Sequence, residues 1–270
     1  MGIQIEMAVT DGIEMQYFRF GEGKRKMVML PGLSVKSIMI YKDAIADGYS
    51  QFAKDYEVYV FEKKKNPPKG YSISEMADDL IKVLDLLNLK DTYVYSVSQG
   101  GMIAQYVAIR RPDLVEALCL GSTTARLTKE SREIILEWNR LANEKDENGL
   151  ILSFSERVYS EKFFARFRDM IVESSKGITD EEFERLANIT DKIGDFDASG
   201  ELGKIKCPVL VLSGSDDRIF GEESVNEFAE KLNCETKVYE GFGHAVYDEN
   251  PVFRKDAKAF FDKINTEGIT

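Results

Sequence analysis

The sequence predicts an α/β protein, in which a mostly parallel central sheet is flanked by helices and interrupted by one inserted helical segment. Two observations predict this fold. Short β-branched or aromatic runs alternate with amphipathic stretches on both sides of the middle of the chain, an alternation typical of parallel strands joined by helices. Residues 123–197 instead show helical periodicity throughout and no convincing strand. We therefore expect one core domain of residues 1–122 and 198–270, interrupted by a helical insertion of residues 123–197.

The elements before the insertion follow one another along the chain. Four strands, rich in β-branched or aromatic residues and bounded by turn signals, are expected at residues 13–20, 26–30, 57–61 and 92–96. Between the last two, residues 74–87 place apolar side chains three and four positions apart, which predicts an amphipathic helix with Ser74 as its N-cap. A further helix is expected from after Ser98 to about Arg111, and residues 114–120 predict another buried strand.

The insertion and the C-terminal part continue the pattern. The insertion predicts four helices, at residues 130–143, 149–159, 161–174 and 179–193. After it, strands are expected at residues 208–212 and 236–239, and helices at residues 222–232 and 252–264. Because strands and helices alternate again here, the insertion interrupts one domain and does not separate two.

The composition narrows the classes of function. The 270 residues include 36 Lys and Arg against 47 Asp and Glu, a formal net charge of −11. Such a charge repels nucleic acids and anionic lipid surfaces. No apolar run approaches the roughly 18 residues that a bilayer crossing needs. We expect neither a nucleic-acid partner nor stable membrane insertion.

The cysteines and the histidine indicate the expected cellular compartment and limit the kinds of metal site that the chain could form. Cys119, Cys207 and Cys234 lie in or beside apolar segments and form no C-x-x-C pair, which is typical of a reducing compartment. The first twelve residues contain no Lys or Arg and no apolar stretch of secretory-signal length, so we expect a cytoplasmic protein. His244 is the only histidine. Histidine-rich metal sites are therefore excluded, and we expect no metal.

Ser98 lies at an expected strand-to-helix turn. Residues 93–102 read YVYSVSQGGM, an apolar strand followed by a turn and a helix. A nucleophile presented on such a turn needs small residues two positions before and after it, here Ser96 and Gly100. The helix N-terminus would add N–H groups and partial positive charge where an oxyanion forms. The alternative is that Ser98 only caps its helix, as serine often does.

Two further segments carry polar residues at expected strand ends. Residues 241–245 read GFGHA, which places His244 after a strand and before the last helix, with Glu249 and Pro251 following. Residues 208–220 read PVLVLSGSDDRIF, in which a buried strand ends at Gly214 and two aspartates follow in the loop. Like Ser98, each of these residues therefore follows the end of an expected strand.

These three segments resemble the α/β-hydrolase family, to which many serine esterases and lipases belong, with its nucleophile motif G-x-S-x-G and its G-x-G-H histidine. The chain order serine, acid, histidine is also that of this family. The resemblance implies that Ser98 is the nucleophile and His244 the general base. It also implies that Asp217, three residues after the strand-end glycine, orients the imidazole. Asp216 is the nearest alternative for the acid.

The same resemblance implies two backbone donors for a developing oxyanion, the N–H of Gln99 and the N–H of Leu33. Leu33 lies in the loop after the second expected strand, where relatives commonly have His-Gly and this chain has Pro31-Gly32. Relatives also often carry an arginine-glycine loop after the third expected strand, where residues 62–66 read EKKKN. We expect this basic loop to be a solvated turn without effect on the chemistry.

Relatives of this family often carry a helical cap, or lid, where this chain has its insertion. A cap would supply the pocket for the acyl or alcohol group and exclude water during attack. Six aromatic residues of the insertion could line such a pocket: Trp138, Phe154, Tyr159, Phe163, Phe164 and Phe167. For each of them the alternative is packing within the insertion itself.

The resemblance implies a serine hydrolase that cleaves small to medium carboxylic esters, or lactones, through an acyl-enzyme intermediate. Its partner would be a small-molecule acyl substrate, and it would need no cofactor. Two alternatives stay open. The same three side chains could serve carbon–carbon bond hydrolysis, lyase chemistry or perhydrolysis, or the scaffold could bind a small ligand without turnover. The sequence also leaves the oligomeric state open.

Overall fold

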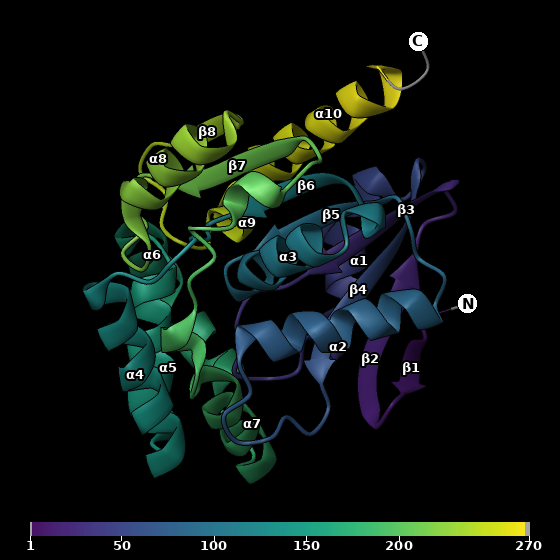
Figure 1. Ribbon diagram of the computed structural model, residues 1–270. Helices are drawn as coiled ribbons and strands as arrows, with labels where there is room; N and C mark the ends of the chain where they lie inside the picture. The colour runs from purple at the N-terminus through teal and green to yellow at the C-terminus, as the bar shows by residue number, and fades with distance from the viewer. Residues whose placement is uncertain (1, 268–270) are drawn as a thin grey trace.

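A computed structural model describes residues 2–267 of the chain. Within these residues one eight-stranded sheet forms the centre of the molecule (Figure 1). Its strands are β1 (Ile5–Thr10), β2 (Ile13–Phe20), β3 (Arg25–Leu30), β4 (Tyr56–Lys64), β5 (Thr92–Val97), β6 (Val115–Gly121), β7 (Val209–Gly214) and β8 (Glu235–Tyr239). They lie side by side in the order β1-β2-β4-β3-β5-β6-β7-β8. Strand β2 pairs antiparallel with β1 and β4, and the other neighbours pair in parallel. The predicted mostly parallel sheet is confirmed.

Helices cover both faces of this sheet (Figure 1). The helices of the core are α1 (Lys42–Gly48), α2 (Ile73–Leu86), α3 (Gln99–Arg110), α8 (Gly221–Leu232), α9 (Val246–Glu249) and α10 (Pro251–Glu267). Successive residues of β3 show why helices form one layer on each face of the sheet. Val28 and Leu30 belong to the apolar cluster that includes α2 and α3, whereas Met27 and Met29 belong to the cluster that includes α10. Alternate side chains of a strand point to opposite faces, so a strand apolar throughout needs helices on both sides.

The segment between β6 and β7 is helical. It contains α4 (Lys129–Glu144), α5 (Glu147–Val158), α6 (Glu161–Ser175) and α7 (Asp180–Thr190). In Figure 1 these helices lie together at the side of the sheet toward which β7 points. The segment leaves and re-enters the core at one place, because Arg126 and Asp197 form a β-bridge and the Ala198 N–H donates to the Ala125 carbonyl over 2.8 Å.

Four local features differ from the expectations. Ser72, not Ser74, is the N-cap of α2, because the Ser72 hydroxyl and the Glu75 side chain bond reciprocally to each other's backbone N–H groups. Strand β1 and the short helices α1 and α9 were not expected. Strand β1 is an edge strand whose apolar side chains Ile5 and Val9 are exposed, so it lacks the usual buried-face pattern.

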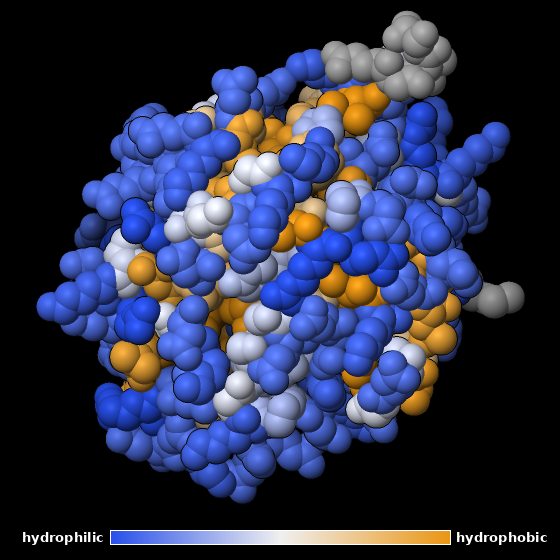
Figure 2. All heavy atoms as spheres, viewed as in Figure 1, coloured by the Kyte–Doolittle hydropathy of each residue, from blue (hydrophilic) through white to orange (hydrophobic). Residues whose placement is uncertain are grey.

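The outer surface is mostly polar on the face drawn in Figure 2, with apolar residues in small separate patches. Among residues 2–267, no helix combines the length and apolar composition needed to cross a membrane.

Candidate active site

Ser98 occupies the sharp turn between β5 and α3. Its backbone has φ of 50° and ψ of −123°, a region that non-glycine residues enter only under constraint. The neighbouring strand end supplies that constraint, since the Ser98 N–H donates to the Gly121 carbonyl over 2.9 Å and the Thr123 hydroxyl donates to the Ser98 carbonyl over 2.7 Å. The Ser98 side chain makes no capping bond to α3. The Ser98 hydroxyl therefore does not cap α3 and remains available for other interactions.

The residues two positions to either side of Ser98 fit the turn for different reasons. A Cβ on Gly100 would lie 2.0 Å from the Leu30 carbonyl oxygen, so only glycine fits there. Ser96 is fully buried, and its hydroxyl donates to the Cys119 carbonyl over 2.9 Å. This hydrogen bond explains how serine replaces the family's usual glycine: its polar atom has a partner inside the sheet.

Asp217 and His244 form a buried pair. Asp217 follows β7, His244 follows β8, and His244 Nδ1 lies 2.9 Å from Asp217 Oδ2. The other carboxylate oxygen accepts the N–H groups of Ile219 and Phe220 over 2.9 and 3.1 Å. Burial alone would raise the pKa of Asp217, but His244 and these two N–H groups together hold it below its ordinary value. Because an ionised Asp217 accepts from Nδ1–H, His244 Nε2 is left as a proton acceptor.

The neighbouring aspartate is placed differently. Asp216 Oδ1 accepts a hydrogen bond from the Ser215 hydroxyl over 2.9 Å, and the Asp216 residue is exposed. Of the two aspartates in this loop, only Asp217 bonds to the His244 ring in the part of the chain that the structure describes.

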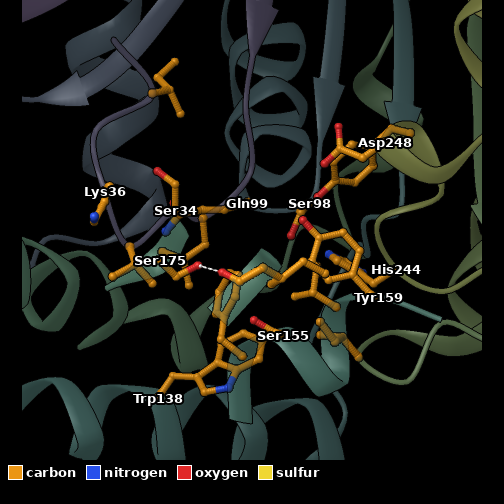
Figure 3. Close-up of a pocket in the computed structure, with 18 of the residues that line it drawn as sticks. Ser34, Lys36, Ser98, Gln99, Trp138, Ser155, Tyr159, Ser175, His244 and Asp248 are labelled. Carbon is orange, nitrogen blue, oxygen red and sulfur yellow. Dashed lines mark hydrogen bonds between the residues drawn. The ribbon is translucent and has the colours of Figure 1, made fainter. Parts of the chain in front are cut away.

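Ser98 and His244 line one cavity of about 450 Å³, which lies between the sheet edge and the helical insertion (Figure 3). Among the described residues, no hydrogen bond joins the Ser98 hydroxyl to the His244 ring. In enzymes without substrate this contact is often long and closes only in the complex. The structure thus brings the three side chains to one edge of the sheet, with the Asp217–His244 bond formed.

The backbone donors expected for an oxyanion also lie at this cavity. Leu33 and Gln99 both line it. A Cβ on Gly32 would lie only 3.0 Å from Ser98 Cβ, which shows how closely the loop before Leu33 approaches the serine. Within residues 2–267, neither the Leu33 N–H nor the Gln99 N–H donates to another protein group. Both donors therefore remain available to a ligand.

Lys63 binds the loop that precedes Leu33. The sequence did not suggest this role. The expectation of a solvated basic turn was wrong for Lys63, which is 7% exposed. Its ammonium donates to the carbonyl oxygens of Pro31 (3.0 Å) and Gly32, and burial lowers the pKa of Lys63 to about 8. In a trans peptide the carbonyl and the following N–H point in opposite directions. Fixing the Gly32 carbonyl on Lys63 therefore turns the Leu33 N–H away from Lys63.

A second buried group fixes the same loop to the insertion. Arg185, on α7, donates to the carbonyls of Ser34 and Val35 over 2.9 and 3.0 Å, and its guanidinium lies 3.5 Å from the Glu62 carboxylate. Glu62 also accepts the Ile38 N–H over 2.9 Å. Arg185 lies far along the chain from this loop, so no sequence signal could have paired them.

The other side of the insertion is joined to the histidine loop. Glu249 accepts the N–H of Ser160, at the start of α6, over 2.7 Å. The Ala245 N–H donates to the Val158 carbonyl over 2.8 Å, and Arg218 donates to the Tyr159 carbonyl over 2.9 Å. The acidic residue noted after the histidine thus has a structural role, and the insertion contacts both walls of the cavity.

Four of the six aromatic residues expected at the pocket line the cavity: Trp138, Phe154, Tyr159 and Phe163. They pack in pairs, with ring centroids 4.7 Å apart for Trp138–Phe154 and 5.2 Å apart for Tyr159–Phe163. Phe164 and Phe167 do not line it. Phe164 is buried, and the Phe167 ring packs against the Phe163 ring with centroids 4.7 Å apart. Adjacent residues of a helix face different directions, which explains why Phe164 does not share the cavity-facing side of Phe163. Phe167 lies one turn further along the same side as Phe163 and contacts its ring but does not line the cavity.

Comparisons with known proteins agree with this architecture. A family model described as "alpha/beta hydrolase fold" matches residues 43–251. The RutD protein of Pseudomonas syringae pv. syringae (strain B728a), named as a carbamate hydrolase, is 25% identical over 80% of this chain and 87% of its own. 3-Oxoadipate enol-lactonase 2 of Acinetobacter baylyi is 22% identical over 77% of each chain. Among solved structures, the enol-lactonase of Burkholderia xenovorans LB400 superposes with a TM-score of 0.83 at 20% identity, over 95% of this chain and 100% of that one.

Proposed function

Because the chain belongs to the α/β-hydrolase family, we propose that it is a serine hydrolase that cleaves small to medium carboxylic esters or lactones. The observation that carries this proposal is the buried Asp217–His244 hydrogen bond of 2.9 Å beside the cavity that Ser98 also lines. A buried carboxylate that orients an imidazole next to a serine on a strained turn suits nucleophilic acyl transfer.

In the proposed reaction His244 Nε2 takes the proton of the Ser98 hydroxyl as Ser98 Oγ attacks the carbonyl carbon. The tetrahedral intermediate then collapses, the bond to the leaving oxygen breaks, and His244 returns the proton to that oxygen. Water next attacks the acyl-enzyme with His244 again as base, and the acid is released from Ser98. Asp217 keeps the imidazole in the correct tautomer and stabilises its protonated form.

The N–H groups of Leu33 and Gln99 are proposed as the donors that stabilise the oxyanion. Both line the cavity beside Ser98, and neither has a protein partner in the part of the chain that the structure describes. Gln99 is the first residue of α3, so the partial positive charge of the helix N-terminus acts at the same place.

Residues 123–197 are proposed as the cap of the site, and residues 1–122 and 198–270 as the hydrolase core. The insertion supplies much of the apolar cavity wall, including Ile135, Trp138, Val158 and Ile171. Its contacts with the oxyanion loop and the histidine loop support a roof that keeps bulk water from the acyl-enzyme.

The cavity suits an acyl substrate of modest size. Its volume is about 450 Å³ and most of its lining side chains are apolar, which is in the range of small-molecule sites. The relatives named for carbamate hydrolysis and enol-lactone hydrolysis act, by those names, on acyl carbons bonded to a heteroatom. We therefore place esters and lactones ahead of carbon–carbon bonds as substrates.

Covalent labelling tests this proposal. A fluorophosphonate should modify the native protein once, at Ser98, and p-nitrophenyl butyrate should be hydrolysed in proportion to the unlabelled fraction. Intact-mass and peptide mass spectrometry locate the label, and heat-denatured protein is the control. A native protein that stays unlabelled would support a ligand-binding role instead. A labelled protein that cleaves a 1,3-diketone faster than esters and lactones would move the proposal to carbon–carbon hydrolysis.

Replacing Lys63 by methionine tests how the oxyanion loop is held. The variant keeps the length of the side chain but removes the donor to the Pro31 and Gly32 carbonyls. We expect kcat for p-nitrophenyl butyrate to fall by about 10- to 100-fold with KM changed little, since oxyanion donors act mainly in the transition state. Lys64→Met is the matched control, because Lys64 pairs with Asp79 away from this loop. A folded Lys63→Met protein with normal kcat would remove Lys63 from this role.

A further inference from the structure

Asp248 is a carboxylate at the cavity that the proposed reaction does not use. It belongs to α9 and lines both the cavity of Ser98 and an adjoining cavity of about 370 Å³. The residue is exposed, and both cavities that it lines are open to solvent. In the described part of the chain the carboxylate makes no hydrogen bond and no ion pair. A cationic ligand held in these cavities would therefore lie beside a carboxylate that no protein group in the described residues pairs with, and charge complementarity of this kind favours specific recognition.

Aromatic rings surround the same space. The two cavities share seven lining residues, among them Tyr41, Tyr159, Tyr247 and Asp248. None of these three phenol hydroxyls has a hydrogen-bond partner within the described residues. Burial and the negative charge of Asp248 raise the pKa of the Tyr159 hydroxyl, so that ring stays neutral. Neutral tyrosine rings beside a carboxylate are the surroundings that attract an organic cation.

Within the described residues, none of the charged groups near Asp248 forms an ion pair with its carboxylate. Arg254 is the nearby cation, but it donates to the Gly48 carbonyl over 3.0 Å and packs over the Tyr49 ring. The protein packed around this exposed side chain raises the pKa of Asp248 to about 6. The charge of Glu249 adds to this effect, and the charge of Arg254 opposes it. The carboxyl group is therefore mostly ionised at neutral pH.

The two ends of the pocket differ in charge. Figure 3 shows Asp248 and Lys36 at opposite ends of the view, with Ser98 between them. The Lys36 ammonium donates to the Lys176 carbonyl. Since only the Asp248 end combines a negative charge with tyrosine rings, it is the end suited to a cation.

We propose that the Asp248 carboxylate and the rings of Tyr41, Tyr159 and Tyr247 form an ammonium subsite, so that the preferred substrates are esters or lactones that carry a cationic amine. This inference rests on the proposed hydrolase function, because it names the substrate class of the same site. The carboxylate supplies charge attraction and the ring faces supply cation–π contacts. The same carboxylate disfavours substrates that carry an anionic group at this end.

A pair of esters of equal shape tests the subsite. Butyrylcholine and 3,3-dimethylbutyl butyrate differ by a positively charged nitrogen in place of a carbon. We expect wild-type kcat/KM to be about 10-fold or more higher for butyrylcholine. Asp248→Asn should lower kcat/KM for butyrylcholine about 10-fold and leave the neutral ester within about threefold. Asp43→Asn, which removes the same charge from an exposed position on α1, should change neither. Equal kcat/KM for both esters in the wild type, or an unchanged ratio in Asp248→Asn, would overturn the proposal.

Binding without turnover separates this proposal from the hydrolase proposal. Calorimetry with tetramethylammonium should show binding to the wild type and to Ser98→Ala, and at least tenfold weaker binding to Asp248→Asn; tert-butanol is the neutral control. If Ser98 resists the fluorophosphonate but tetramethylammonium binds through Asp248, the hydrolase function fails and the subsite stands. If Ser98 is labelled but tetramethylammonium does not bind, the subsite fails and the hydrolase function stands.

Discussion

Ser98→Ala is expected to lower kcat for p-nitrophenyl butyrate hydrolysis by roughly 10⁵-fold or more, because it removes the hydroxyl proposed to form the acyl-enzyme. The fold should persist. Alanine keeps the Cβ that lies against Gly32, and the bonds that hold the turn come from the Ser98 backbone. Release of p-nitrophenol measures the rate, and thermal unfolding measures the stability.

Ser122 offers a matched control for this substitution. It also follows a strand, has φ of 40°, and carries a buried hydroxyl without a partner within the described residues. It does not line the Ser98 cavity. Ser122→Ala should therefore keep kcat within about threefold of the wild type. Substantial turnover by a folded Ser98→Ala protein would show that Ser98 is not the nucleophile.

Asp217→Asn is expected to lower kcat by about 10⁴-fold. An asparagine amide can donate to His244 Nδ1, which would leave the ring proton on Nε2 and remove the base that faces Ser98. The side chain stays nearly the same size, so the loop should keep its shape. Steady-state kinetics on a chromogenic ester measure the effect.

Asp216→Asn is the control that separates the two aspartates. Asp216 bonds to Ser215 and is exposed, so its substitution should leave kcat within about threefold. If Asp216→Asn were the inactive variant and Asp217→Asn the active one, the assignment of the acid would be reversed.

The pKa of Asp217 also predicts an acid dependence of stability. His244 and two N–H groups hold it below the ordinary value, so the ionised carboxylate stabilises the native state above about pH 4. This contribution is lost as the pH falls through the folded-state pKa. Asp217→Asn should therefore lose less stability than the wild type between neutral pH and pH 3, as measured by urea unfolding.

Much of the fold could be predicted from sequence because its signals are local. Buried parallel strands are short apolar runs, the core helices have amphipathic periodicity, and the helical insertion lacks strand patterns altogether. The turn at Ser98 was predictable because its motif combines a strand end, small neighbours and a helix start within ten residues. The first strand was missed for the converse reason: Ile5 and Val9 lie on an exposed edge, where burial does not shape the pattern.

The fold class, the turn that presents Ser98, and the strand ends that carry Asp217 and His244 were predictable from sequence, because each depends on neighbours within a few residues. The identity of the other side chains at the cavity became clear from the three-dimensional packing. Lys63 was expected in solvent, and Asp248 carried no signal that it faces the pocket. Such positions depend on packing between segments far apart in the chain, and local periodicity does not encode which surfaces meet.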